Sequence, residues 1–254
     1  MVRFTTFGLY SQGVRWANTI VDRGWFGLKP LERHIVICGC PRAGTTLLHL
    51  MLTVSLQARS FGRERRATDA AQRALRNHRT LLTKRPNDIF ELDAIRDIYK
   101  TRLGTPYFLV NIRDPRDVLV SQHSAREGEY YVSLDRWQQI YNAINACRYE
   151  QDVLFVVFEN LVRNTARVGR DISTFTGLPL VTSMESFLTS VPQGFKATAL
   201  NGIRPPDLSA IGRWRNEEHR ARMKQIITEV PQFTDHLITW GYETDDQWIS
   251  AFRD

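Results

Sequence analysis

Residues 39–46 read GCPRAGTT and stand directly between an apolar run and a helix-like stretch. A glycine at each end lets the chain turn tightly and brings backbone N–H groups close to an anion. The helix that we expect from Thr45 adds unpaired N–H groups and the positive end of its dipole. The spacing is that of the phosphate loop G-x-x-x-x-G-K-[ST], but Thr45 replaces the lysine and the cation is Arg42. The sequence therefore predicts a phosphate-binding loop; the alternative is a tight turn that binds nothing. The expected contacts are Pro41, Arg42, Ala43, Gly44, Thr45 and Thr46.

A second group of polar residues, IRDPRDVLVSQHS, follows a later apolar run and begins at residue 112. Arg113 offers a planar fork to a phosphate, and Ser121, further along, offers a hydroxyl donor. Asp114 can cap a helix with Pro115 at its first position, which puts Ser121 about two turns along that helix. The pattern predicts a second phosphate site. The alternative is a surface arginine paired with Asp114 or Asp117.

The elements that must position these residues are short apolar runs alternating with helix-length amphipathic stretches. This alternation is typical of a parallel sheet with helices on its faces. We expect strands at 34–39, 81–84, 107–112 and 153–158, and helices at about 45–57, 133–147 and 161–176. The chain therefore reads as one α/β domain over residues 34–254, preceded by an N-terminal segment, residues 1–33. Proline and glycine recur in residues 191–216, and a long irregular stretch of this kind predicts a loop that covers the site.

The N-terminal segment has no uninterrupted apolar stretch and no small-residue cleavage site, so it does not read as a signal peptide. No apolar run approaches the ~20 residues of a membrane span. We expect a helix that packs on the core, with peripheral membrane contact as the alternative. Three cysteines suit a reducing compartment, and a cytoplasmic protein is the expectation. Cys38 and Cys40 have no second Cys/His pair, so we expect no metal site.

The net charge of +7 is concentrated in one segment. Residues 59–85 contain nine arginines and lysines against two acidic residues, which accounts for the whole excess. A concentrated positive field favours an anionic ligand, although a solvated helix face is the alternative. Aromatic residues do not interleave with the basic ones as stacking platforms, so we expect no nucleic-acid partner.

These motifs together resemble a known family. PRAGTT resembles the 5′-phosphosulfate loop of sulfotransferases that use 3′-phosphoadenosine 5′-phosphosulfate (PAPS), whose usual forms are PKSGTT and PRSGTT. The arginine form is nearer the tyrosylprotein and carbohydrate branches. The Arg113 and Ser121 pair is similar to the family's 3′-phosphate motif. FENLVRNT (158–165) resembles Y-E-D-L-V-x-N-P, and LSAIGRWRNE (208–217) resembles the C-terminal loop that folds over the nucleotide.

The resemblance covers residues 34 to 242 and implies a P-loop nucleotide-kinase-like fold. It implies transfer of a sulfuryl group from PAPS to a hydroxyl or amine, with Arg42, Thr45 and Thr46 on the 5′-phosphosulfate. Lys84, in TKRPNDIF, looks like the family's K-x-P element and would bind the sulfuryl or bridging oxygen. In the C-terminal loop Arg213 and Arg215 would contact phosphate. Trp214 would pack on or near the adenine, or form a surface cation–π cluster instead.

The catalytic base is open, because Arg85 stands in the element where the cytosolic branch has its histidine. Glu64 lies close to where the tyrosylprotein and carbohydrate branches place a glutamate base. Neighbouring cations hold Glu64 ionised but weaken it as a base, and neutralising the arginines around it is an alternative role. His78 has the better intrinsic pKa for work near neutrality. No metal is required if two cationic side chains and a helix terminus supply the positive charge.

Two other functions remain open from the sequence. One is a phosphotransferase with a degenerate loop, which predicts ATP binding and magnesium dependence. The other is a nucleotide-binding protein of the same fold without catalysis. For the acceptor, the basic segment slightly favours an anionic or sugar-like molecule, such as a carbohydrate or glycolipid, over an apolar phenol.

Overall fold

The computed structural model describes residues 6–23, 25, 30–73, 78–123, 126, 128–190, 195 and 205–253. Its centre is a five-stranded sheet in the order β2-β3-β1-β4-β5, and every pair of neighbours is parallel. The strands are β1 (Arg33–Gly39), β2 (Arg59–Ser60), β3 (Thr80–Lys84), β4 (Thr105–Ile112) and β5 (Val153–Val157). The expected α/β fold with a parallel sheet is confirmed, and all four expected strands are present. The sequence missed β2, which has two residues and no apolar run.

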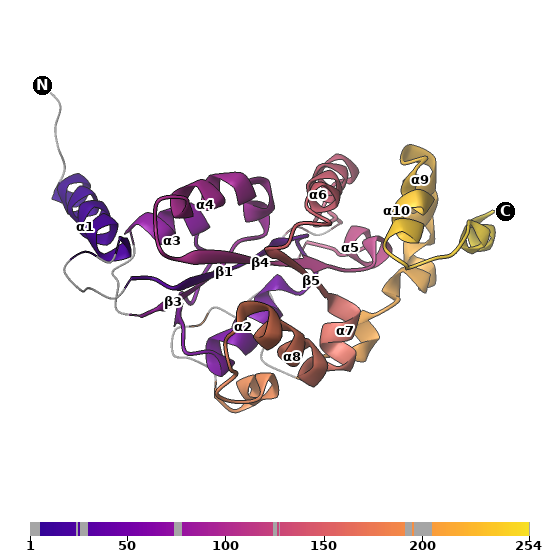
Figure 1. Cartoon of the computed structure of the whole chain (residues 1–254). Coiled ribbons are helices and arrows are strands. Elements are labelled where there is room, and N and C mark those ends of the chain that lie inside the picture. Colours follow the sequence, from indigo (N-terminus) through magenta and orange to yellow (C-terminus); the bar gives the residue numbers. More distant parts are fainter. Residues whose placement is uncertain are drawn as a thin grey trace, which may run out of the picture.

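Helices cover both faces of this sheet (Figure 1). One face carries α2 (Thr45–Ser55), α7 (Phe158–Arg163) and α8 (Thr165–Thr176); the other carries α3 (Ala67–Arg73), α4 (Leu92–Tyr99), α5 (Pro115–Leu119) and α6 (Leu134–Ala146). Alternate residues of β1 point to opposite faces. Ile35 and Ile37 join the core under α2 and α8, whereas Val36 and Cys38 join the core under α3, α4 and α6. Because both faces are buried, the strands read as continuous apolar runs.

The C-terminal part packs beyond the β5 side of the sheet (Figure 1). It consists of α9 (Arg220–Glu229), α10 (Phe233–Thr239) and the 3₁₀ helix η8 (Gln247–Phe252). Trp137 of α6 anchors it, with its ring centroid 5.1 Å from that of Phe233. Three short 3₁₀ turns lead into α9: η5 (Leu208–Ala210), η6 (Arg213–Arg215) and η7 (Glu217–His219). Of the loop expected at 191–216, residues 191–194 and 196–204 lie outside the described residues.

The N-terminal helix α1 (Thr6–Asp22) packs against α3 at the opposite end of the molecule from α9 and α10 (Figure 1). Val14 and Asn18 are buried in this contact, and Asn18 Nδ2 donates a hydrogen bond to the carbonyl of Gln72. Asp22 forms an ion pair with Arg102, at 2.7 Å. Within the described part of the chain, we find no helix with the length and apolar character needed to span a bilayer.

Candidate active site

The phosphate loop leaves the carboxyl end of β1 and enters α2 at Thr45. Gly44 precedes the helix with φ 82°, a left-handed conformation that favours glycine, and a Cβ there would lie 2.6 Å from the Phe158 ring. Ala43 is buried below the loop, where Asn111 Nδ2 donates to its carbonyl oxygen at 3.2 Å. The glycine and the asparagine therefore fix the shape of the loop from two sides.

Arg42 is the one non-glycine residue with positive φ in the described chain, at 68°. A left-handed conformation at such a residue costs about 1–3 kcal/mol and is found mostly at functional sites. The guanidinium lies over the Tyr131 ring, 5.3 Å from its centroid, and its buried Nε has no hydrogen-bond partner among the described residues. Burial lowers the pKa of Arg42, and the nearby cations Arg113 and Arg213 lower it further. An anion at this point would reverse that penalty.

The loop opens into a cavity of about 450 Å³ at the carboxyl edge of the sheet. Nine residues singled out in the sequence line it: Pro41, Arg42, Gly44, Thr45, Thr46, Glu64, Lys84, Arg113 and Arg213. The other five, which are Ala43, His78, Ser121, Trp214 and Arg215, lie outside its lining. Residues that are up to 172 positions apart in the sequence, from Pro41 to Arg213, thus line one cavity. The ends of β1, β3 and β4 meet at the same edge of the sheet and bring the phosphate loop, Lys84 and Arg113 together there.

Lys84 lies at the end of β3 and connects two sides of this cavity. Its Nζ donates to Thr46 Oγ1 at 3.1 Å and to Glu64 Oε1 at 2.8 Å. The lysine side chain is 7% exposed and the Glu64 side chain is 56% exposed. The cation is therefore fixed in the wall, whereas the carboxylate faces the opening, where a second molecule can reach it.

The segment that carries Glu64 has no regular secondary structure, and hydrogen bonds to Lys84 at the end of β3 and to Asp88 after it hold it in place. The Arg65 N–H donates to the carbonyl oxygen of Lys84 at 3.2 Å. Three residues after Glu64, the Ala67 N–H donates to Oδ2 of the buried Asp88 at 3.0 Å. These bonds tie the carboxylate and the lysine to one another through the backbone as well as through the ion pair.

His49, one turn into α2, also lines the cavity and was missed by the sequence analysis. Its Nε2 lies 2.9 Å from Ser60 Oγ, which lies 2.8 Å from Thr53 Oγ1. The Thr53 hydroxyl donates its proton to the carbonyl oxygen of His49, so it can only accept from Ser60. Because the Ser60 proton goes to Thr53, Ser60 Oγ accepts from His49 Nε2–H. Burial, with a smaller effect from Lys84, lowers the pKa of His49 to about 3. His49 is therefore neutral and acts as a hydrogen-bond donor. The sequence signal that could have placed it at the site is its position four residues after Thr45, one turn along the same face of the helix.

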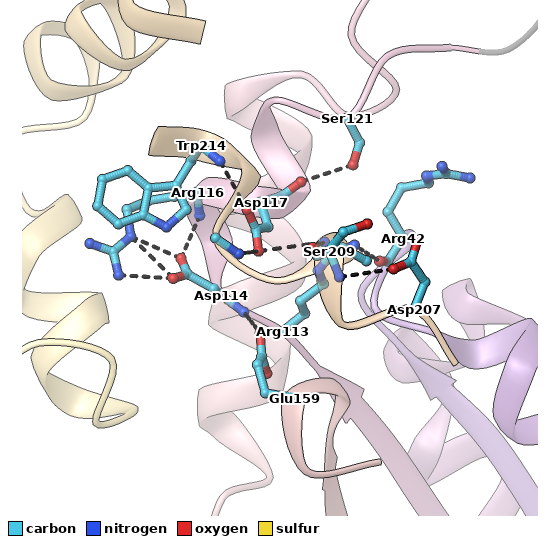
Figure 2. A network of polar contacts seen from close by, with 12 residues as sticks. Arg42, Arg113, Asp114, Arg116, Asp117, Ser121, Glu159, Asp207, Ser209 and Trp214 are labelled. Carbon is cyan, nitrogen blue, oxygen red and sulfur yellow. Dashed lines mark hydrogen bonds and ion pairs between the residues drawn. The ribbon is translucent and has the colours of Figure 1, made fainter. Parts of the chain in front are cut away.

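Arg113, directly after β4, bridges the phosphate loop and the C-terminal turns (Figure 2). Its Nη1 donates to the carbonyl of Arg42 at 3.0 Å, and its Nη2 donates to the carbonyl of Ala210. Asp117 lies 3.5 Å away, and the guanidinium carbon stands 4.5 Å from the centre of the Phe158 ring. The Nε atom is buried without a hydrogen-bond partner among the described residues. Arg113 therefore keeps one donor unused at the cavity.

Asp114 caps α5 as expected, because its side chain accepts from the Arg116 N–H. The expectation that Ser121 lies about two turns along this helix is wrong. The helix ends at Leu119, and the Ser121 hydroxyl donates to the carbonyl of Asp117 at 2.8 Å. Figure 2 shows Ser121 on the far side of Asp117 from Arg113. A contact of Ser121 with a 3′-phosphate thus stays a prediction that needs the hydroxyl to turn.

Asp117 anchors the turn that carries Arg213, whereas from the sequence its role was only an alternative one, as a partner of Arg113. Its buried carboxylate accepts from the Gly212 N–H at 2.7 Å and from the Trp214 N–H at 3.1 Å (Figure 2). These bonds hold the turn across the end of α5 and direct Arg213 toward the cavity. We call residues 205–216, from the described chain before η5 to the residue that follows η6, the lid.

Trp214 and Arg215 lie on the other side of this lid. The guanidinium carbon of Arg116 lies 3.9 Å from the centroid of the Trp214 ring, and that of Arg215 lies 4.1 Å from it. Trp214 lines a second cavity, with Trp248 and Phe252. The ring thus makes cation–π contacts, as in the alternative interpretation, but it is buried and one partner is the buried Arg116 of α5, so the cluster is not a surface one. Packing of Trp214 on or near an adenine stays a prediction.

His78 is exposed, beside residues 74–77, which lie outside the described part of the chain. Within the described residues, no group of three His, Cys, Asp or Glu side chains is arranged to hold a metal ion. Of the two candidate bases, only Glu64 lines the cavity that the phosphate loop opens into.

Comparison with known proteins places this arrangement in context. The model of the sulfotransferase domain family matches residues 32–217. The sulfotransferase domain from the Synechococcus PCC 7002 olefin synthase has a TM-score of 0.52 and 16% identity, over 73% of this chain and 88% of that one. Mouse sulfotransferase SULT7A1, in a crystal structure with PAP, has a TM-score of 0.51 and 12% identity, over 87% and 89%. These structures share the fold. No curated protein matches the chain significantly.

Proposed function

The chain belongs to the sulfotransferase domain family, and from this premise we propose that it transfers a sulfuryl group from PAPS to a hydroxyl or amine acceptor. The observation that carries the proposal is a single cavity in which the phosphate loop, three cations and the Glu64 carboxylate meet. The cations Arg42, Arg113 and Lys84 come from three separate parts of the chain, and each side chain is directed to the same space.

The residues present fit the anionic groups of PAPS. Arg42 Nε and Arg113 Nε are buried donors without partners among the described residues, and an unsatisfied buried donor costs about 1–3 kcal/mol. Phosphate and sulfate oxygens supply the missing acceptors. Arg42, Thr45 and Thr46, with the N–H groups at the start of α2, bind the 5′-phosphosulfate. Arg113 binds the 3′-phosphate, and Arg213 adds a charge from the lid.

Lys84 and Glu64 supply the chemistry. Lys84 Nζ donates to the oxygen that bridges phosphorus and sulfur, where negative charge grows as the sulfur–oxygen bond breaks. Glu64 accepts the proton of the acceptor hydroxyl or amine as its oxygen or nitrogen forms the new bond to sulfur. The electron pair of the broken bond stays on the leaving 5′-phosphate. The buried lysine keeps its position through Thr46, while the exposed carboxylate is accessible to the acceptor.

The acceptor that we propose is polar, and a carbohydrate or glycolipid is the class that fits best. Around Glu64 the cavity is lined by Gly62, Arg63 and His49, which offer charge and hydrogen-bonding groups. Phe195 adds one aromatic face beside His49, with ring centroids 5.3 Å apart. A sugar presents both hydroxyl groups and an apolar ring face, so it matches this mixture better than an apolar phenol does.

The test is transfer of ³⁵S from labelled PAPS to a panel of sugars, glycolipids, phenols and amines, with and without a metal chelator. A parallel thermal-shift series compares adenosine 3′,5′-bisphosphate, ATP with magnesium and ATP alone. We expect that sulfuryl transfer to a polar acceptor persists in the presence of the chelator. We also expect that adenosine 3′,5′-bisphosphate raises the melting temperature of the protein. Stabilisation only by ATP with magnesium would contradict the proposal and support a phosphotransferase. Nucleotide binding without transfer to any acceptor would indicate an inactive member of the fold.

A further inference from the structure

The N-terminal helix α1 has one face docked on the domain and one face without a partner among the described residues. Val14, Asn18 and Asp22 make the docked face, and they contact α3, Gln72 and Arg102. This contact fixes the orientation of the helix, so its remaining face points away from the core. Figure 1 shows α1 at the extreme end of the molecule, far from the C-terminal helices.

The outward side of this region is aromatic and basic. Trp16 is 71% exposed, which makes it the most exposed tryptophan among the described residues, and Trp25 is 47% exposed. Arg15 and Arg23 are also exposed, and the Arg23 guanidinium carbon stands 5.0 Å from the centre of the Trp25 ring. We call these four residues the outer patch. The acidic residue of the helix, Asp22, is buried and paired with Arg102, so it does not reduce the charge of the patch.

The sequence around the outer patch has the same bias. Residues 1–30 contain six aromatic residues, a fifth of the segment, whereas aromatics make up 11% of the whole chain. The same thirty residues contain four arginines and lysines against one acidic residue. The excess is separate from the nucleotide cavity, because none of the α1 side chains that the structure describes lines that cavity.

We propose that the outer patch binds the surface of an anionic lipid bilayer, so that the protein attaches peripherally through α1. Tryptophan rings are enriched at the level of lipid headgroups, where the ring meets the acyl boundary and its N–H stays hydrated. Arginines beside them face anionic headgroups, and each basic residue near such a surface strengthens binding on the order of fivefold. The inference rests on α1 and the residues directly after it, and it is independent of the proposed transferase activity.

The shape of the patch favours a bilayer over a protein partner. Protein interfaces seat their aromatic anchors in well-packed pockets. The outer patch lies on α1 and on the residues directly after it, and neither the loop cavity nor the cavity behind the lid contains any of its residues. A bilayer needs no pocket, since tryptophan inserts into the headgroup layer itself.

The test uses the full chain with vesicles of phosphatidylcholine alone and vesicles with about 30% phosphatidylglycerol, by co-sedimentation at low salt. We expect at least about tenfold tighter binding to the anionic vesicles and a loss of most of it at about 0.5 M salt. The double variant W16S/W25S should bind at least about tenfold more weakly, because both rings leave the interface. Brominated lipids should quench the fluorescence of the wild type more than that of this variant.

Matched controls separate the outer patch from general charge. Arg15→Glu should weaken binding, whereas Arg167→Glu makes the same charge change on an exposed residue of α8 and should leave it nearly unchanged. Tyr149→Ser removes another exposed ring and should also be neutral. Circular dichroism checks that each variant is folded. Absence of binding to anionic vesicles, or equal binding by W16S/W25S and the wild type, would overturn the proposal. So would tryptophan-dependent self-association without vesicle binding, which would indicate a protein contact.

Discussion

Lys84 Nζ lies 2.8 Å from Glu64 Oε1, so the residue proposed to stabilise the leaving group and the residue proposed as base form one ion pair. The pair joins a buried cation to an exposed carboxylate. In this arrangement the Glu64 carboxylate stands at the mouth of the cavity, held there by the buried lysine. An acceptor that approaches Glu64 is also brought next to the lysine.

Glu64→Gln should lower turnover by about a hundredfold or more while the affinity for adenosine 3′,5′-bisphosphate stays within about threefold. Glutamine keeps the shape of the side chain but cannot accept the proton of the acceptor. The measurements are steady-state rates and nucleotide titration. Glu32→Gln removes an exposed, arginine-paired carboxylate elsewhere and serves as the control. If Glu64→Gln keeps normal turnover and His78→Gln abolishes an acid limb in the pH profile, the base is His78.

Lys84→Ala should lower turnover by about a hundredfold and the affinity for the nucleotide by much less. The contact of Lys84 with the bridging oxygen strengthens as charge grows in the transition state, so its loss affects mainly the rate of the chemical step. Single-turnover rates and nucleotide titration separate the two effects. An equal loss in both quantities would mean that Lys84 only binds the ground state.

The loop, four of the five strands and nine of the cavity's lining residues were predictable from the sequence because their signals are local. The glycines of the loop fix its turn, and the buried strands read as apolar runs, so both follow from short stretches of residues. Arg42, Lys84 and Arg113 each stand just after or at the end of such a run. In a parallel sheet these ends share one edge, which brings the three cations together without any knowledge of the helices.

What could not be predicted depends on contacts between distant residues or on the exact end of a helix. Asp117 lies 95 residues before Gly212, and no local pattern indicates that one caps the other. The tautomer of His49 follows from Ser60, which lies in a two-residue strand without an apolar signal. Ser121 was misplaced because α5 ends after five residues, where its sequence alone would allow a second turn.

Arg113→Ala should weaken binding of adenosine 3′,5′-bisphosphate by about tenfold or more, in line with roughly 1.5–3 kcal/mol for a charged hydrogen bond. Binding of adenosine 5′-phosphate should weaken less, because that ligand lacks the 3′-phosphate. Some loss for both ligands is expected, since Arg113 also holds the carbonyls of Arg42 and Ala210. The readout is the ratio of the two affinities by calorimetry, with Arg167→Ala as the control. An unchanged ratio would remove Arg113 from the 3′-phosphate site.

Asp117→Ala should release the lid. The substitution leaves the N–H groups of Gly212 and Trp214 without their acceptor, at a cost of about 1–3 kcal/mol each if they stay buried. The lid should therefore open more often, which lets the backbone after the exposed Arg213 and Arg215 unfold locally for cleavage by trypsin and weakens nucleotide binding by about tenfold. Limited proteolysis with and without adenosine 3′,5′-bisphosphate measures this opening. Asp171→Ala, on the exposed side of α8, is the control. Unchanged cleavage in the Asp117 variant would show that other contacts hold the lid.

His49→Gln should make the protein less sensitive to acid. Burial lowers the pKa of His49 to about 3 in the folded protein, whereas an unfolded histidine titrates near 6.5. Between these values the unfolded chain binds a proton that the native protein does not, so the free energy of unfolding of the wild type falls as the pH falls through this window. The loss from this residue amounts to roughly 2 kcal/mol between about pH 7 and pH 5. Glutamine does not titrate and keeps an N–H donor for Ser60, so the variant should lose less stability over the same interval. Urea unfolding at several pH values measures the two slopes, and the exposed His78→Gln should keep the slope of the wild type. Parallel slopes for His49→Gln and the wild type would mean that His49 can take up a proton without leaving its place beside Lys84.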